Sequence, residues 1–423
     1  IEALLGECRI AHDRIMAVRI DENVLVPILS VRSQFMKVER RSEVGERIRV
    51  SVQLIRVNNS LTLWAGRLDE TLTDIFALQD SIAEQVARAL KLSVIALPRP
   101  QGTDNLDIWQ LYLQGRYFQD KRTVEGLYKS ISCAEEVIAL APQFAMAYAC
   151  LADSYNLLGE YLYIAPNEAF PAAQNAVTQA LALDPNLAEA HASQAEIYMF
   201  YDWDWVRAER EYRIAIELNP NYATAYHWYG WLLMTCGRFD EASHHLRMAQ
   251  RIDPNSLYVK TALGLPHYYR GEYDLAILHH RQAIEMDGQF TAAHYYLGEA
   301  LVQKGKYEEA LQAFQYVLKA HSQQSVALYG HTMALAGRTA EAHLSLRELR
   351  ELATQHYVSS YCFALLHVAL DDFDAAFAAL EQAITERAAW LIFLSIDPFL
   401  KRLQEDPRFA SLQQKVIGRS VAA

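Results

Sequence analysis

Small residues recur every 34 positions through the middle of this chain. Gly230, Gly264 and Gly298 are 34 residues apart. The same interval separates two further sets of small residues: Gly237, Gly271 and Gly305, and Ala242, Ala276 and Ala310. A fixed period of this length is typical of stacked supersecondary units, each too small to bury its own apolar face. The pattern therefore predicts a solenoid that offers a binding surface rather than a catalytic pocket.

Prolines mark the ends of the units. Pro142, Pro185, Pro220 and Pro254 each follow an apolar helix end, at spacings of 43, 35 and 34 residues. The long spacing reflects an insertion over 161–167. Between these breaks the apolar residues follow the helical period, which predicts helix–turn–helix units. We count eight of them: 108–142, 145–185, 188–222, 223–256, 257–290, 291–322, 323–356 and 357–390.

The residues inside each unit resemble the tetratricopeptide repeat. The second unit has Tyr148, Leu151, Ala152 and Tyr155 at the bulky, leucine, small and aromatic positions of the first helix, and Gly159 at the turn. The small position lies where the two helices of a unit approach most closely, so a larger side chain would force them apart. The turn glycine supplies a left-handed C-cap.

Two departures from the period carry specific predictions. Pro266 falls inside the first helix of the fifth unit, so that helix should kink. The string from Asp202 to Trp205 has two readings: its tryptophans anchor a longer turn, or they form an exposed aromatic lip for a ligand. After Trp390 the chain predicts closing helices, because Pro398 and Pro407 each follow an aspartate.

The chain ahead of the repeats has a different pattern. Residues 48–57 alternate apolar and polar side chains and 61–68 return as a second strand, which predicts a β-hairpin over 46–68. An amphipathic helix is predicted over 71–97. Prolines and a glycine then mark a linker at 98–104. The predicted organisation is summarised by four ranges: a small α/β domain at 1–97, the linker at 98–104, a mainly α solenoid with a right-handed superhelical twist at 105–390, and capping helices at 391–423.

Several strings resemble a group of bacterial multidomain regulators. They are IRVSVQLIRV, LTLWAGRLDE, LTDIFALQDSIAEQVARAL, YLQGRY, DWDW and DPRF, and they spread over residues 46–412. In that group a small TolB-like or FlgO-like domain precedes tetratricopeptide repeats. An upstream output module is a winged-helix DNA-binding domain, a Ser/Thr kinase or an adenylate cyclase. The resemblance implies that this chain is the regulatory arm, with its output module upstream of Ile1. The first 45 residues lack the β–α–β pattern of such a domain.

Charge narrows the class of partner. The net charge is −12, and the residues after position 100 hold 25 Lys/Arg against 38 Asp/Glu. An acidic repeat region disfavours direct contact with nucleic acid, since phosphate binding needs a basic surface. No apolar run approaches the roughly 18 residues that span a bilayer. We expect a protein or peptide partner, with basic residues as a candidate feature, no direct contact of this chain with nucleic acid, and no membrane segment within it.

Motifs for chemistry are lacking in the sequence. No P-loop, GxGxxG, GxSxG or HExxH string occurs, and the five cysteines form no CxxC pair. His244-His245 and His279-His280 lie one repeat apart and have two readings, packed imidazoles or a metal site; no acidic or thiol ligand recurs beside them. We therefore expect no enzyme activity, no metal and no cofactor.

The concave surface of the repeats is the predicted binding site. In the family, fixed positions of the first helices line this groove. Here they are Asp153, Asn156, Glu196, Met199, His227, Trp231, Tyr258, Tyr268, Tyr269, Tyr295, Glu299 and Gln303. Aromatic rings beside acidic groups suit an extended peptide or a segment bearing Lys or Arg.

The predicted function is a non-enzymatic sensor or scaffold module of a bacterial signalling or transcriptional regulator, binding a partner in this groove. Two alternatives stay open. One is small-molecule or glycan sensing by the solenoid, and the other is assembly into a homodimer. The cytoplasm is favoured as the compartment, with the periplasmic side of a membrane-tethered regulator as the alternative.

Overall fold

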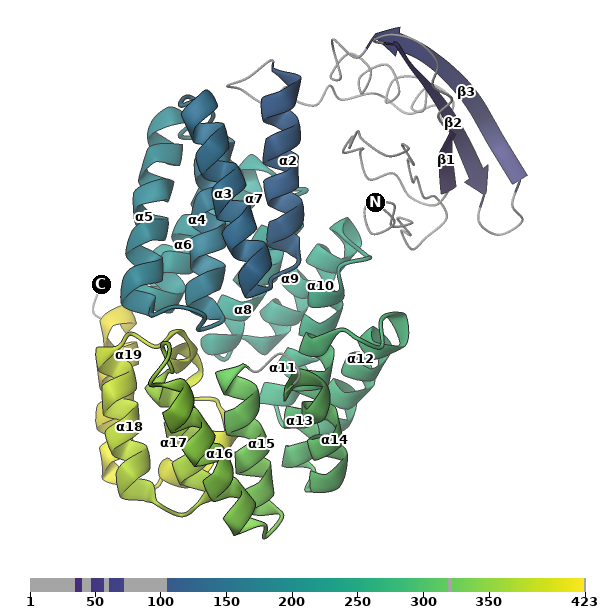
Figure 1. Cartoon of the computed structure of the whole chain (residues 1–423). Coiled ribbons are helices and arrows are strands. Elements are labelled where there is room, and N and C mark those ends of the chain that lie inside the picture. Colours follow the sequence, from purple (N-terminus) through teal and green to yellow (C-terminus); the bar gives the residue numbers. More distant parts are fainter. Residues whose placement is uncertain (1–34, 40–46, 57–60, 72–104, 319–321, 422–423) are drawn as a thin grey trace.

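The computed structural model describes residues 35–39, 47–56, 61–71, 105–318 and 322–421 (Figure 1). Helices make up almost all of the two long ranges, and the three short ranges are strands. The described part of the chain is therefore mainly α, as the sequence predicts.

The three strands form one small antiparallel sheet. They are β1 (Phe35–Glu39), β2 (Arg47–Arg56) and β3 (Leu61–Thr71), in the order β1-β2-β3. β2 and β3 pair in the region of the predicted hairpin, with Val50 opposite Leu68. The helix predicted over 71–97 and the linker at 98–104 lie, beyond Thr71, outside the described residues. The TolB-like or FlgO-like domain therefore stays a prediction.

Eight helical hairpins follow one another in the described residues, one for each predicted unit. Units one to four are α2 (Leu106–Asp120) with α3 (Val124–Leu140), α4 (Ala145–Glu160) with α5 (Pro166–Leu183), α6 (Ala188–Ile197) with α7 (Trp205–Leu218), and α8 (Ala223–Thr235) with α9 (Phe239–Ile252). Units five to eight are α10 (Leu257–Ala262) and α11 (Leu265–Tyr269) with α12 (Tyr273–Met286), α13 (Thr291–Gln303) with α14 (Tyr307–Leu318), α15 (Gln323–Leu335) with α16 (Thr339–Leu352), and α17 (Ser360–Ala369) with α18 (Phe373–Thr385).

The recurring glycine of the first helices lies where the two helices of a unit approach most closely. A methyl group added at Gly230 would lie 2.8 Å from the Leu246 side chain, and one at Gly298 would lie 2.5 Å from the Phe314 ring. Carbon atoms essentially never approach this closely, so any side chain at either position would push the helices apart. The 34-residue period is therefore a packing requirement.

The turn between the two helices of a unit needs a left-handed residue. Gly237 has a φ of 70°, and its N–H donates to the Met234 carbonyl at 2.9 Å. The last unit has Asp371 at this position, and it takes up the same conformation with a φ of 61°. The turn is kept there at the cost of backbone strain.

Both departures from the period are visible in the fold. The first helix of unit five is broken between Ala262 and Leu265, directly before Pro266, which confirms the predicted kink. In unit three, the π-helical turn η2 (Tyr198–Asp202) leads to Trp203, which has a φ of 56° and is 1% exposed. The tryptophans of this turn are buried anchors, so the reading of an exposed aromatic lip is wrong.

After the last hairpin the chain crosses back toward the first units. The predicted capping helices are two short 3-10 helices, η3 (Ala389–Phe393) and η4 (Pro398–Leu403), followed by α19 (Pro407–Val421). In Figure 1 the yellow C-terminal segment meets the lower end of the blue early units. The eight hairpins are thus joined into a closed arrangement by their own C-terminal segment.

We predict that Gly298→Ala destabilises the chain in spite of the better helix propensity of alanine. The added methyl group would clash with the Phe314 ring, and overpacking of this kind costs about 1–3 kcal/mol. Urea unfolding followed by circular dichroism measures the change. Gly288→Ala is the control, because the nearest atom to its added methyl group is 3.9 Å away. Equal midpoints for the two variants would contradict the packing role of Gly298.

Candidate functional site

The C-terminal segment is held against the first helices of the early units by specific hydrogen bonds. The Trp390 indole N–H donates to the Glu160 carbonyl at 3.0 Å, and the Arg387 guanidinium donates to the Tyr201 carbonyl at 3.1 Å. The residues of 388–394 other than Trp390 are buried, each at most 2% exposed. A segment that is covered on every side is part of the core, so the solenoid has no open centre at this level.

The predicted insertion at 161–167 adds a second closing contact. Leu162 is 1% exposed, and its carbonyl accepts a hydrogen bond from the Gln323 amide at 2.8 Å. The Tyr163 hydroxyl donates to the Arg122 carbonyl at 3.4 Å. This loop therefore ties unit two to unit seven on one side and to unit one on the other.

The twelve predicted groove residues gather around these contacts. Eight of them are buried: Asp153, Asn156, Glu196, Met199, His227, Trp231, Tyr268 and Glu299. Tyr258, Tyr269, Tyr295 and Gln303 are half-buried. A role of these residues in partner binding stays a prediction, but the open groove expected over them is mostly interior, because the chain covers it with its own residues.

The aromatic residues of the set already contact other side chains of the same chain. The Tyr269 ring stacks on Phe393 with centroids 5.0 Å apart, and the Trp231 ring lies 5.7 Å from Phe393. Tyr258 holds the Arg122 guanidinium 4.0 Å from its ring centroid. These contacts are the stacking and cation–π interactions that the sequence suggested for a partner, and here they join distant units.

The acidic residues of the set are enclosed with few partners. Burial raises the pKa of Asp153 to about 6, against the lowering effect of Arg116, and raises the pKa of Glu196 well above its usual range. Burial also raises the pKa of Glu160, which lies outside the set, to about 8, opposed by Arg122. The three carboxyl groups are therefore biased toward their neutral forms by their surroundings.

A cavity of about 30 Å³ lies beside two of these carboxyl groups. Arg116, Gln119, Asp153 and Glu196 are among its lining residues. A water molecule needs about 10–15 Å³ of such space, so the cavity has room for two or three waters and none for a side chain of a partner.

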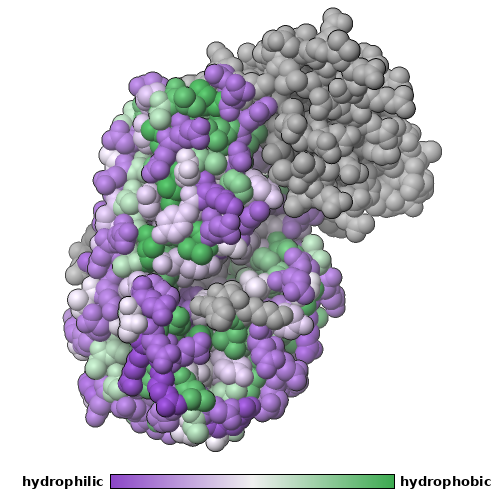
Figure 2. All heavy atoms as spheres, viewed as in Figure 1, coloured by the Kyte–Doolittle hydropathy of each residue, from purple (hydrophilic) through white to green (hydrophobic). Residues whose placement is uncertain are grey.

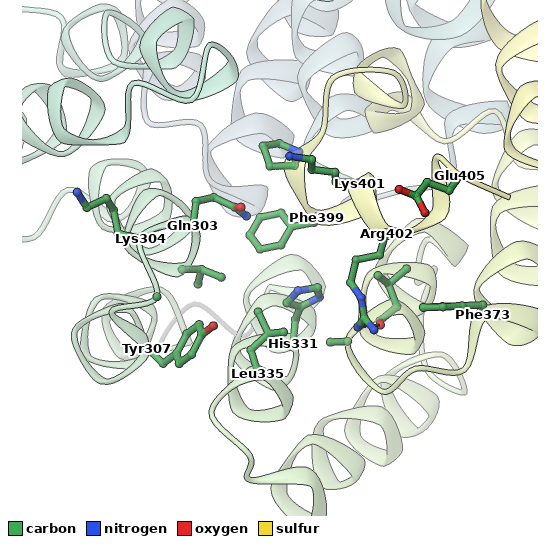
Figure 3. A pocket seen from close by; sticks show the side chains of 15 residues that line it. Gln303, Lys304, Tyr307, His331, Leu335, Phe373, Phe399, Lys401, Arg402 and Glu405 are labelled. Carbon is green, nitrogen blue, oxygen red and sulfur yellow. Dashed lines mark hydrogen bonds between the residues drawn. The ribbon is translucent and has the colours of Figure 1, made fainter.

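A much larger cleft is open to solvent between the last three units and η4 (Figure 3). Its volume is about 780 Å³. Its apolar lining includes Val302, Leu335, Val368, Phe373 and Phe399, and its polar lining consists of Gln303, Lys304, Tyr307, His331, Lys401, Arg402 and Glu405. Gln303 is the member of the predicted set that faces this opening. We call this opening the C-terminal cleft.

Basic side chains stand around the C-terminal cleft, in a chain whose repeats are acidic overall. The Lys304 ammonium pairs with Asp274 at 2.9 Å. The Arg402 guanidinium pairs with Asp371 and lies 5.1 Å from the centroid of the Phe373 ring. Within residues 105–318 and 322–421, no carboxylate pairs with the exposed Lys401.

His331 is a neutral group in the wall of the cleft. Its Nδ1 lies 2.7 Å from the Leu365 carbonyl, so Nδ1 must carry the proton and Nε2 remains an acceptor. Burial lowers the pKa of the imidazole to about 4, in spite of this hydrogen bond. The ring also packs edge-on against Phe399 with centroids 4.8 Å apart.

Sequence reasoning missed the residues that close the solenoid and the residues of the C-terminal cleft other than Gln303. A signal for the closing segment is present in the chain, because Trp390 to Leu394 is an unbroken apolar run. Such a run in a capping segment indicates burial on more than one side. No comparable signal marks Lys401 or Arg402, because their meeting with unit six depends on how the solenoid curves.

One histidine of each pair is accounted for by packing, and the His245 ring lies 4.4 Å from the Tyr229 ring. His280 is fully buried against Gly264, and burial lowers its pKa to about 3. In the described part of the chain, no group of three or more His, Cys, Asp or Glu side chains is placed to hold a metal ion. Among the same residues, no helix combines the length and the apolar character that a membrane span requires.

Stacked helical hairpins with a close-packed small residue and a left-handed turn define an α-solenoid. Family models described as "Tetratricopeptide repeat" match residues 211–242 and 261–325. The first range runs from the second half of α7 through α8 to the start of α9, and the second runs from the first helix of unit five to the start of unit seven. The chain therefore contains tetratricopeptide repeats.

Two curated proteins share more distant similarity with it. The transcriptional regulator HilA of Salmonella typhimurium is 21% identical over 346 residues, which are 79% of this chain and 59% of HilA. Anaphase-promoting complex subunit 3 of Schizosaccharomyces pombe is 22% identical over 178 residues, 42% of this chain and 25% of that protein. The chain therefore spans a quarter to somewhat over half of the length of these relatives.

Solved structures show the same fold at low sequence identity. A monomeric mutant of IFIT1 with Gppp-AAAA has a TM-score of 0.52 at 15% identity, covering 80% of this chain and 76% of that one. The Cut9–Hcn1 hetero-tetramer of the anaphase-promoting complex has a TM-score of 0.50 at 15% identity, covering 79% of this chain and 59% of that one. At this level of identity the likeness concerns the fold alone.

We predict that Trp390 contributes strongly to stability through the closing contacts. Trp390→Phe keeps an aromatic ring but leaves the Glu160 carbonyl without its donor, which costs about 1 kcal/mol. Trp390→Ala also removes the ring packed near Trp231, at about 3–5 kcal/mol. Urea unfolding gives the two values, and hydrogen exchange should quicken at the end of α4. Tyr128→Ala, at a residue 50% exposed on α3, is the control. Similar losses for Trp390→Ala and Tyr128→Ala would refute the role of Trp390.

A second prediction concerns the pH dependence that Glu160 confers. The pKa of about 8 lies above the 4.5 of an unperturbed glutamate, so the folded chain binds this proton more tightly than the unfolded chain. The stabilisation is complete below pH 4.5 and is lost as the pH rises toward about 8. Glu160→Gln should therefore gain stability relative to the wild type over this range, by up to about 1.4 kcal/mol per pH unit. Urea unfolding at several pH values tests this, and a constant difference between the two proteins would contradict it.

Proposed function

We propose that this chain is the protein-binding, non-enzymatic arm of a bacterial signalling or transcriptional regulator, and that its partner docks at the C-terminal cleft. The tetratricopeptide-repeat fold is a scaffold for binding proteins. The observation that carries the choice of site is the contrast between a filled centre and an open cleft of about 780 Å³.

The rest of the described surface offers a partner no comparable cluster of apolar side chains. The exposed large apolar side chains are spread over α3, α7, α12, α14 and α16. On the face shown in Figure 2, apolar residues are interspersed with polar ones. A partner that buries apolar surface therefore gains most at the cleft, where apolar and polar groups converge on a concave site.

The regulatory context is supported by the similarity to HilA, which extends over 79% of this chain. It is also supported by the strings shared with TolB-like and FlgO-like regulators. In this proposal, occupancy of the cleft is relayed to an output module elsewhere in the full protein. The binding step belongs to the repeats, and the output belongs to the other module.

A second candidate is small-molecule sensing at the same cleft. Its volume of about 780 Å³ lies within the range of about 300–1,000 Å³ that is usual for ligand pockets. A thermal-shift screen separates the two, because a small ligand that binds only the folded chain raises the unfolding midpoint without any protein present.

Site-specific photo-crosslinking tests the proposed function. A benzoyl-phenylalanine replaces Tyr307 in the cleft, or Tyr128 on α3 as the matched control. Irradiation of cells that make the full protein should give a defined adduct from position 307 and none from position 128. The captured protein, once purified, should bind the unlabelled chain in calorimetry at one-to-one stoichiometry. Adducts of equal yield from both positions, or from position 128 alone, would show that the cleft is not the docking site.

A further inference from the structure

The hydrogen bonds that close the solenoid join two halves of the chain. We call units one to four the first half, and units five to eight with the C-terminal segment the second half. Residues 387–394, which include η3, are called the strap. Within the strap, Arg387 and Trp390 donate hydrogen bonds to the main-chain carbonyls of Tyr201 and Glu160 in the first half. The strap therefore ties together parts of the chain that lie far apart in the sequence.

The strap is itself fixed to the second half. The Phe393 ring stacks on Tyr269 of α11 with centroids 5.0 Å apart. Just beyond the strap, the buried Asp397 carboxylate accepts a hydrogen bond from the Tyr361 hydroxyl of α17, and α17 packs against η4. The strap is therefore part of the second half, and its hydrogen bonds to the first half are the ones that a separation of the halves would break.

The junction between units four and five differs from the other junctions. The backbones of neighbouring first helices lie close together at the others, whereas α8 has at most marginal contact with α10 and α11. The first helix of unit five is also broken, because Pro266 has no N–H to donate to the Ala262 carbonyl. A few backbone angles at such a break absorb a rotation while the helices on either side stay rigid. Unit five therefore has the properties of a hinge.

The closed form buries polar atoms that have no hydrogen-bond partner among the described residues. Beside the strap these atoms are Glu160 Oε2 and the indole nitrogens of Trp203 and Trp231. Within unit five they are Thr261 Oγ1 and the Tyr268 hydroxyl. A buried polar atom without a partner destabilises the state that buries it, and water becomes its partner when the site opens. The closed form is therefore less stable than its apolar packing alone would make it.

We infer that the solenoid opens as two rigid halves about unit five, and that the strap holds it closed. Opening breaks the hydrogen bonds of Arg387 and Trp390 to the first half and leaves the strap on the second half. It uncovers Trp231, a residue of the predicted groove that the strap covers in the closed form. The C-terminal cleft is lined by residues of the second half alone, so this inference goes beyond the proposed function and does not depend on it.

Distances between pairs of spin labels, measured by double electron–electron resonance on the whole chain, test the inference. Cys8→Ser and Cys236→Ser first remove thiols that would compete for the label, and the other three cysteines are buried. Labels on cysteines at Tyr128 of α3 and Leu344 of α16, which are 50% and 52% exposed, span the two halves. The wild type should give one short distance, with at most about a tenth of the molecules at a longer one. In Trp390→Ala the longer distance should become the main one, because the strap has lost its hold on the first half.

Two label pairs that each lie within one half are the first control. Positions 128 and 206 are on α3 and α7 of the first half, and positions 278 and 344 are on α12 and α16 of the second; all four residues are exposed. Both distances should be the same in Trp390→Ala as in the wild type, because each half moves as a rigid body. Phe377→Ala is the second control. It removes a buried ring of α18 within the second half, so the distance between positions 128 and 344 should not change.

Three outcomes would overturn the inference. Broadening of all three distances in Trp390→Ala would show that the strap and both halves form one cooperative unit that only unfolds as a whole. An unchanged distance between positions 128 and 344 in Trp390→Ala would show that the strap does not hold the halves together. A longer distance in Phe377→Ala as well would show that any loss of core packing opens the chain. The adduct at position 307 requires no opening, so the proposed function is judged separately.

Discussion

The close approach of two helices at a residue without a side chain is the constraint on which the rest of this structure depends. At Gly298 even a methyl group would overlap the Phe314 ring, and at Gly230 it would overlap Leu246. Each hairpin can close only because that space is kept free. The closed hairpins then stack at a repeating geometry, and small rotations between units add up to a curved array. The curvature brings the C-terminal segment back to the early units.

The returning C-terminal segment covers the inner face of the solenoid. Trp390 packs against Trp231, and Phe393 stacks on Tyr269; both partners belong to the predicted groove. The Glu160 carbonyl accepts a hydrogen bond from the Trp390 indole N–H. Because the centre is filled, the open, concave C-terminal cleft lies at the edge between the last units and η4. Function is therefore expected where the solenoid stops being regular, which agrees with the general rule that binding residues lie on irregular segments held by a rigid scaffold.

The distribution of charge follows from the same closure. Several carboxyl groups that would give a groove its acidic character, such as Glu196 and Glu299, are covered, and burial raises their pKa values. At the C-terminal cleft, Lys304 and Arg402 are paired with Asp274 and Asp371, which are exposed to water. The net charge of −12 is thus a poor guide to the charge at any one part of the surface, because buried acidic groups count in the composition but contribute little to the field outside.

Much of the fold was determined by the sequence alone, since the 34-residue period, the turn glycines and Pro266 each act within one unit or between neighbours. Local rules of packing and backbone conformation are enough to predict eight hairpins and the kink at Pro266. The C-terminal cleft could not be predicted in the same way. Of the twelve predicted groove residues, only Gln303 lines the C-terminal cleft, and its other residues come from segments as far apart as Lys304 and Lys401. Which distant residues meet depends on the accumulated curvature of all eight units, a sum that no single repeat encodes and that only the tertiary structure decided.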